Sequence, residues 1–126
     1  MNRFCSALAT GAAVLGLALA VAQPAACEPS GLEPAFGNTI VSTHPDGRQA
    51  KLWLNADHTF QAEGRAGNRS AGAWQVRRGR LCLTQRRPVP IPFSYCHAYP
   101  HVSVGARWAD MAVNGDHVTN RVVAGR

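Results

Sequence analysis

Two cysteines flank the stretch CLTQRRPVPIPFSYC and raise the question of redox, metal or structural chemistry. These are Cys82 and Cys96, while Cys27 lies much earlier in the chain. A redox pair requires close thiols beside a helix N-terminus, which lowers a thiol pKa, and neither feature is present. The N-terminus predicts export to an oxidising compartment, where neighbouring thiols tend to pair. We therefore predict a structural disulfide between Cys82 and Cys96, with free thiols or another pairing as alternatives.

Histidines near the second cysteine are candidate metal ligands. His97 and His101 follow Cys96 in the stretch CHAYPH. Residues four apart face the same side only on a helix, and Pro100 argues against a helix at this point. A metal site would also need Cys96 to be unpaired. The other histidines are scattered through turn sequences: His44, His58 and His117. We expect exposed loop histidines, with no metal site and no other cofactor.

Carboxylates and hydroxyls give little support for catalysis. The sequence has no G-x-S-x-G, no H-E-x-x-H and no glycine-rich phosphate loop. Of the 7 Asp+Glu residues, only Glu63 and Asp110 fall in expected strands. The others lie near the N-terminus or in turns, where Asp forms local hydrogen bonds. We expect no enzymatic activity.

Five arginines surround the segment between the cysteines and make it a candidate binding surface. They are Arg77, Arg78, Arg80, Arg86 and Arg87. With 13 Lys+Arg against 7 Asp+Glu, the chain suits an anionic envelope polymer or another envelope macromolecule, and nucleic acid is not expected outside the cell. A turn at Gly79–Arg80 and a rise of about 3.3 Å per residue put Arg86 and Arg87, beyond the next strand, about 20 Å away. The arginines therefore form two patches, and a solvated, charge-protected sheet edge is the alternative.

Tryptophans and prolines add further candidate contacts. Trp53 faces away from Leu52 and Leu54 in an alternating strand, which makes it a candidate exposed contact residue. Trp74 alternates with polar neighbours on a face that we expect to be buried. Alternating prolines favour an extended segment that resists edge pairing: Pro88, Pro90 and Pro92.

The first 26 residues have the features of a secretory signal peptide. Arg3 precedes an apolar run from Ala7 to Val21, and residues 20–22 have the A-x-A form that signal peptidase requires. The run of about 15 residues is short for a membrane span, which needs about 20. A lipoprotein signal that ends at Cys27 is the alternative. We expect a periplasmic or secreted protein, with membrane attachment only through a lipid anchor on Cys27.

The rest of the chain reads as a tether over residues 27–35 and a single β-domain over 36–126. Short runs of β-branched and aromatic residues alternate with turn signals. They cover 37–43, 49–55, 59–65, 71–78, 81–86, 92–99, 104–113 and 117–126. His58 takes a position where glycine is usual in such turns, and histidine tolerates a positive φ there. We predict an all-β, antiparallel up-and-down meander of about eight strands, closed or flattened into a barrel that hides its edges.

The central part of this domain resembles a known pattern. Its residues are Asp57, Thr59, Phe60, Gly72, Trp74, Val76, Gly79, Leu81, Cys82 and Cys96. They resemble the D-G-T-F…G-x-W-x-V-x-x-G-x-L-C…C signature of small exported proteobacterial proteins of unknown function, which are loosely lipocalin-like. His58 departs from the usual glycine. The resemblance implies an exported β-domain and no catalytic residues, because its members are mostly turn and core residues.

Three functions remain open on the sequence. The first is a non-catalytic, monomeric envelope protein that binds a macromolecular or anionic partner through its surface. The second is a lipocalin-like binder of a small apolar ligand. We rank it lower because side chains are expected to fill so small a barrel. The third is a secreted inhibitor of a protease or another enzyme.

Overall fold

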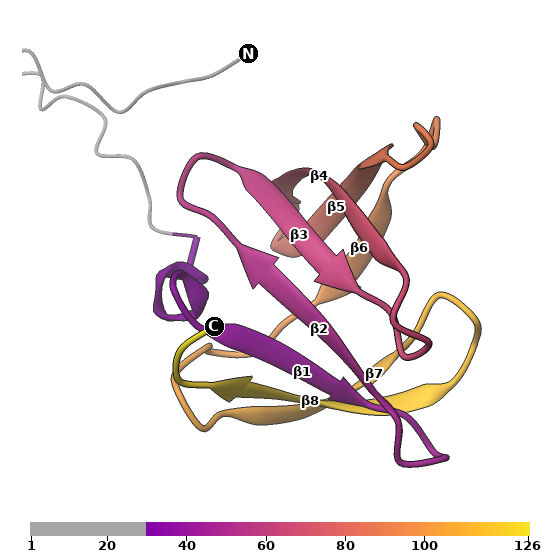
Figure 1. Ribbon diagram of the computed structural model, residues 1–126. Helices are drawn as coiled ribbons and strands as arrows, with labels where there is room; N and C mark the ends of the chain where they lie inside the picture. The colour runs from indigo at the N-terminus through magenta and orange to yellow at the C-terminus, as the bar shows by residue number, and fades with distance from the viewer. Residues whose placement is uncertain (1–29) are drawn as a thin grey trace, which may run out of the picture.

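The computed structural model describes residues 30–126 and shows an all-β domain. A turn of 3-10 helix, η1 (Glu33–Ala35), precedes eight strands (Figure 1). They are β1 (Thr39–Thr43), β2 (Gln49–Leu54), β3 (Thr59–Glu63), β4 (Arg69–Arg77), β5 (Arg80–Arg87), β6 (Tyr95–Ala98), β7 (Arg107–Met111) and β8 (His117–Val123). Within residues 30–126, no helix is long and apolar enough to cross a membrane. The predicted meander of eight strands is confirmed.

One antiparallel sheet curls into a nearly closed barrel. Its strand order is β6-β5-β4-β3-β2-β1-β8-β7, so every strand except β6 and β7 pairs with both neighbours. The pairing of β1 with β8, in which Ile40 opposes Val122, joins the first and last strands of the domain. At the seam between β6 and β7, Nδ1 of His97 lies 3.4 Å from Oδ1 of Asp110. This side-chain contact therefore links β6 and β7, the two edge strands of the sheet.

Four hairpin loops share one backbone design: residues 44–48, 55–59, 64–68 and 112–116. In each loop the first N–H donates to the fifth carbonyl, and the fourth N–H donates to the first carbonyl. The fourth residue has a positive φ, as in hairpin loops that end with a left-handed residue. Glycine occupies this position in three of the loops. In loop 55–59 it is His58, with φ 67°. The predicted positive φ at His58 is therefore confirmed. The His58 ring stacks on Trp74 with centroids 4.1 Å apart, and this packing offsets the backbone strain.

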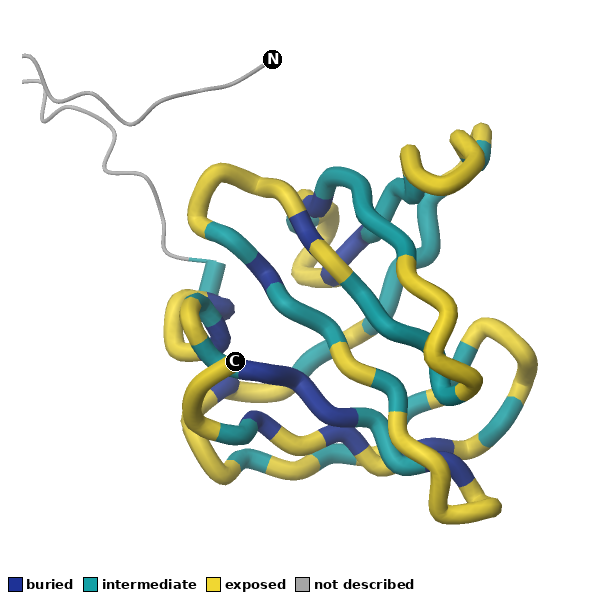
Figure 2. Tube along the Cα trace, in the orientation of Figure 1, coloured by how far each residue is buried: buried dark blue, intermediate teal, exposed yellow. Residues whose placement is uncertain are grey.

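The hydrophobic core fills the end of the barrel where η1 and the C-terminus lie. It joins Leu32, Ala35, Ile40, Leu54, Phe60, Trp74, Leu81, Val102 and Val122. Figure 2 shows the first part of β1 buried, whereas the hairpin loops at the opposite end are exposed. Trp74 is buried as predicted, and its Nε1 donates to the carbonyl of Asn55 at 2.9 Å. We call this part of the barrel the filled end.

The segment predicted as a tether is partly folded. Leu32 is 1% exposed and belongs to the core. The hydroxyl of Tyr99 donates to the carbonyl of Ser30 at 2.6 Å. The boundary placed at Phe36 was therefore wrong, because apolar side chains before it close the filled end. The predicted signal peptide and Cys27 lie outside the residues that the structure describes.

The predicted disulfide is confirmed. Cys82 on β5 stands directly opposite Cys96 on β6, and their sulfur atoms lie 2.07 Å apart. Leu81 and Leu83, on either side of Cys82, point to the barrel interior, so the disulfide lies on the outer face. It joins the edge strand β6 to the rest of the sheet.

The β4–β5 hairpin turns one residue earlier than predicted. Arg78 and Gly79 occupy the turn with φ of 51° and 72°, and Arg77 pairs with Arg80. This is the two-residue hairpin loop with positive φ at both central positions. β5 continues through Arg87, so the prediction that the strand ends before it was wrong. The strand continues because a β-bulge keeps it paired with β4.

Candidate functional site

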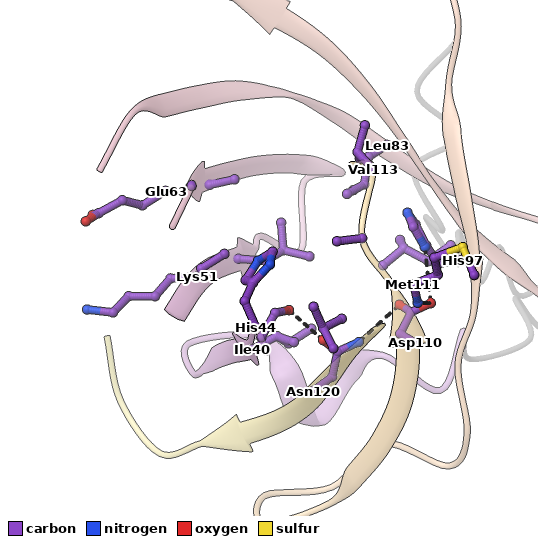
Figure 3. Close-up of a pocket in the computed structure, with 18 of the residues that line it drawn as sticks. Ile40, His44, Lys51, Glu63, Leu83, His97, Asp110, Met111, Val113 and Asn120 are labelled. Atoms are coloured by element: carbon purple, nitrogen blue, oxygen red, sulfur yellow. Dashed lines mark hydrogen bonds and ion pairs between the residues drawn. The ribbon is translucent and has the colours of Figure 1, made fainter. Parts of the chain in front are cut away.

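A cavity of about 260 Å3 occupies the barrel end opposite the filled end (Figure 3). All eight strands contribute to its wall, β4 through Ser70 alone, and loops 64–68 and 112–116 form part of its rim. Most of the wall is apolar, with Ile40, Leu52 and Leu83 toward the core. Side chains therefore fill one end of the barrel as expected, but not the end that holds the cavity.

Small inward-facing side chains explain the cavity. Ser42 on β1 pairs with Ala50 on β2, and Ala62 on β3 pairs with Ser70 on β4. All four line the cavity. Side chains at these positions occupy the interior of the barrel on neighbouring strands, and none of them is long enough to reach across it. At the filled end the equivalent inward positions hold Ile40, Leu54, Phe60 and Trp74 instead.

One wall of the cavity is polar and internally hydrogen-bonded. The Ser42 hydroxyl donates to Oδ1 of Asn120, and Nδ2 of Asn120 donates to Oδ2 of Asp110 at 3.1 Å. Oδ1 of Asp110 accepts the backbone N–H of Met111 at 2.7 Å and lies 3.4 Å from Nδ1 of His97. Asn120 is only 6% exposed. We call Ser42, Asn120, Asp110 and His97 the polar wall; its contacts are dashed in Figure 3.

The polar wall is arranged to hold a ligand group. Asp110 faces Nδ1 of His97, which leaves Nε2 as the ring nitrogen that a ligand can approach. A serine nucleophile needs an adjacent base such as histidine. The Ser42 hydroxyl instead donates its hydrogen bond to Asn120. Within residues 30–126, no three side chains of His, Cys, Asp or Glu come together as metal ligands. The arrangement offers acceptors and donors to a bound molecule.

Two histidines differ from the expectation of exposed loop residues. His97 lies within β6 and contributes to the cavity wall. His44 follows β1 and is 8% exposed, with Nδ1 2.9 Å from Oδ2 of Asp116. Both lie on or beside strands whose alternation turns them inward. The burial of His44 and the partial burial of His97 depend on barrel closure, which local sequence does not reveal.

Charged residues tie three loops together at the rim of the cavity. Nη1 of Arg65 lies 3.3 Å from Oδ2 of Asp46 and 3.2 Å from Oδ2 of Asp116. His44 contacts the same Asp116 oxygen. These residues belong to loops 44–48, 64–68 and 112–116, and we call them the rim clasp. A single guanidinium therefore joins hairpins that are far apart in sequence.

Acid should weaken the rim clasp. The hydrogen bond from His44 lowers the pKa of Asp116 below 3.8, with Asn114 and Arg65 adding to the effect. Because the folded-state pKa is the lower one, the stabilisation is complete above the unfolded pKa and is lost as pH falls through the folded value. We expect Asp116→Asn to be less stable than wild type at pH 7, with the difference shrinking below about pH 4. Urea unfolding at both pH values measures this; a difference independent of pH would contradict it.

The predicted surface residues separate into distinct places. Arg77, Arg78 and Arg80 gather at the β4–β5 turn, whereas Arg86 and Arg87 lie at the other end of β5. The two predicted patches are therefore present. Trp53 lies on the outer face of β2, where its Nε1 donates to Oγ1 of Thr39 at 2.9 Å, and it is partly buried. Trp53 and Arg87 line the same outer groove, and Arg86 does not line it.

Sequence reasoning singled out Asp110 and His97 but did not connect them. It missed Asn120 and Ser42, whose polar side chains point inward from β8 and β1. The available signal was the run of small residues at inward positions of consecutive strands. No protein-family model, curated protein or solved structure shows significant similarity to the chain. The resemblance to small exported proteobacterial proteins therefore rests on the sequence pattern alone.

Proposed function

We propose that this protein is a non-catalytic binding protein whose barrel cavity holds a small, mostly apolar molecule. The observation that carries the proposal is the cavity of about 260 Å3 beneath the rim clasp. An apolar protein cavity of about 150 Å3 binds benzene. By the same ratio this cavity suits a ligand of roughly ten non-hydrogen atoms. Its volume lies just below the range of about 300–1,000 Å3 that is usual for ligand pockets.

The polar wall supports a ligand with one hydrogen-bonding group. The apolar side of the cavity, with Leu52, Leu83 and Val118, suits a hydrocarbon or aromatic body. Opposite, Asp110 offers carboxylate oxygens, and His97 offers a ring nitrogen. A ligand hydroxyl or amine placed there gains a charge-assisted hydrogen bond. A wholly apolar ligand displaces water from these groups and offers no hydrogen bond in return, which costs binding free energy.

Binding of 1-naphthylamine tests this proposal, because the dye combines a naphthalene body with one amine. We expect saturable 1:1 binding with a Kd of roughly 10–100 µM, which corresponds to about 0.5–0.6 kcal/mol per non-hydrogen atom. Its fluorescence should shift to the blue on entering the cavity. Ala50→Phe places a ring in the cavity and should weaken binding by roughly tenfold or more, because the two rings compete for one volume.

Gln49→Phe is the matched control for this test. Gln49 precedes Ala50 on β2 and is exposed on the outer face, so the same ring is added outside the barrel. Its dye affinity should equal that of wild type, and circular dichroism should show both variants folded. Naphthalene, which lacks the amine, should bind more weakly than the dye. Equal affinity in Ala50→Phe and wild type, or the same loss in Gln49→Phe, would overturn the proposal.

Surface binding of an anionic envelope partner is a second candidate function. The observation that favours it is the outer groove, which both Trp53 and Arg87 line. Inhibition of a secreted enzyme and export to the periplasm stay predictions from the sequence. So does the absence of catalysis.

A further inference from the structure

The outer groove crosses four strands on the face opposite the cavity. Its floor is a row of directly paired residues: Trp53 on β2 pairs with Gln61 on β3, Gln61 with Ala71 on β4, and Ala71 with Arg87 on β5. Arg69 and Pro88 complete the sides, and the groove has a volume of about 280 Å3. Ala62 and Ser70 contribute to its lining as well as to that of the cavity. The small Ala71 side chain in the middle of the row leaves the hollow between a tryptophan and an arginine.

A β-bulge places Arg87 in this row. β4 and β5 pair regularly from Arg77 to Gly72, and the register then shifts, so that Ala71 opposes Arg87. Alternation from the outward Cys82 would otherwise turn Arg86 outward and Arg87 inward. The extra residue shifts the alternation by one position, so that Arg87 pairs with the outward-facing Ala71, since a bulge re-aims the side chains that follow it. Arg87 thereby joins the outer face that carries Trp53.

The charges of the groove favour an anion. Arg87 is exposed, and among residues 30–126 it takes part in no ion pair. Arg69 has a side chain 79% exposed and only a 3.5 Å contact with Glu63. The chain has a formal net charge of +6. A carboxylate or sulfate at this end of the groove would therefore meet positive potential, and a guanidinium binds such groups with two parallel hydrogen bonds.

We propose that the groove binds an acidic saccharide, a site separate from the cavity and independent of the ligand proposed there. Strands lie about 4.8 Å apart, so three strand steps separate Trp53 from Arg87 by about 14 Å. This span matches a short run of sugar rings. The indole offers an apolar surface for one ring, fixed by its hydrogen bond to Thr39. Gln61 offers an amide that both donates to and accepts from sugar hydroxyls.

Calorimetric titration with a tetrasaccharide of galacturonic acid tests the site. Wild type should bind it, and the fully methyl-esterified tetrasaccharide should bind roughly tenfold more weakly, because it lacks the charge that the arginines recognise. Arg87→Gln should weaken binding of the acid form by roughly tenfold. The Nε1–H signal of Trp53 in an 15N–1H NMR spectrum should shift on titration with the acid form.

Arg86→Gln is the matched control, since it removes the same charge from the adjacent residue outside the groove. Its affinity should stay within about twofold of wild type, apart from a small loss of long-range attraction. Equal losses in both variants would show attraction by net charge alone and would overturn the proposal. Absence of binding to the acid form would overturn it as well. Tighter binding of a tetraglutamate peptide than of the tetrasaccharide would assign the groove to acidic proteins and reject the saccharide.

Discussion

Replacing Cys82 and Cys96 together with alanine should lower the free energy of unfolding by about 3 kcal/mol, because a cross-link of this loop length restricts the unfolded chain. The disulfide joins positions 14 apart in sequence. It also fastens β6, an edge strand of four residues that pairs only with β5. For a domain of about 100 residues this loss corresponds to a fall in Tm of roughly 10–20 °C.

Thermal unfolding followed by circular dichroism measures this effect in the protein as purified. Treating wild type with a phosphine reductant should reproduce the loss seen in the double variant. The same reductant should leave the double variant unchanged, which separates the disulfide from any effect of the reagent. A double variant with the wild-type Tm would show that the cross-link contributes nothing to stability.

A single methyl group at Gly72 should have an effect of similar size. A Cβ built at this position would lie 1.9 Å from the carbonyl oxygen of Thr84 and 3.0 Å from Cε1 of Phe60. The first contact is with backbone and cannot be relieved by a side-chain rotation. Gly72→Ala should therefore force β4 and β5 apart and lower the free energy of unfolding by about 3 kcal/mol.

Gly47→Ala is the control for the substitution at Gly72. Gly47 has φ +82° and open space around the built Cβ, so alanine there adds backbone strain without a clash. It should cost only about 1 kcal/mol. Urea unfolding of both variants gives the comparison. Equal losses would mean that the close approach of β4 and β5 at Gly72 is not what requires glycine.

Gly72 also links the fold to the outer groove. It lies beside the register shift that turns Arg87 outward, so its substitution should disturb the groove as well as stability. If the acidic saccharide site is correct, Gly72→Ala protein that remains folded should lose binding of the galacturonate tetrasaccharide. Gly72 itself lines neither the groove nor the cavity on the other face.

Local patterns in the sequence determined the fold and its cross-link. Alternation of apolar and polar residues over short runs is a property of each strand by itself, and so is the chemistry of each turn. His58 illustrates this, because the loop design that requires a positive φ lies within residues 55–59. Cys82 and Cys96 were predicted to pair because their expected strands follow one another in the chain. The buried position of Trp74 also followed from alternation.

Only the tertiary structure decided where the hollows lie and which polar groups meet in them. The cavity depends on small residues from four strands arriving at one end of the barrel, while larger residues arrive at the other. Asp110 meets His97 because the sheet curls until β7 approaches β6. Arg87 lies on the same outer face as Trp53 because a bulge changes the register by one residue. Closure and register are set by contacts distant in sequence, so a one-residue shift reverses which face a side chain takes without altering the local pattern.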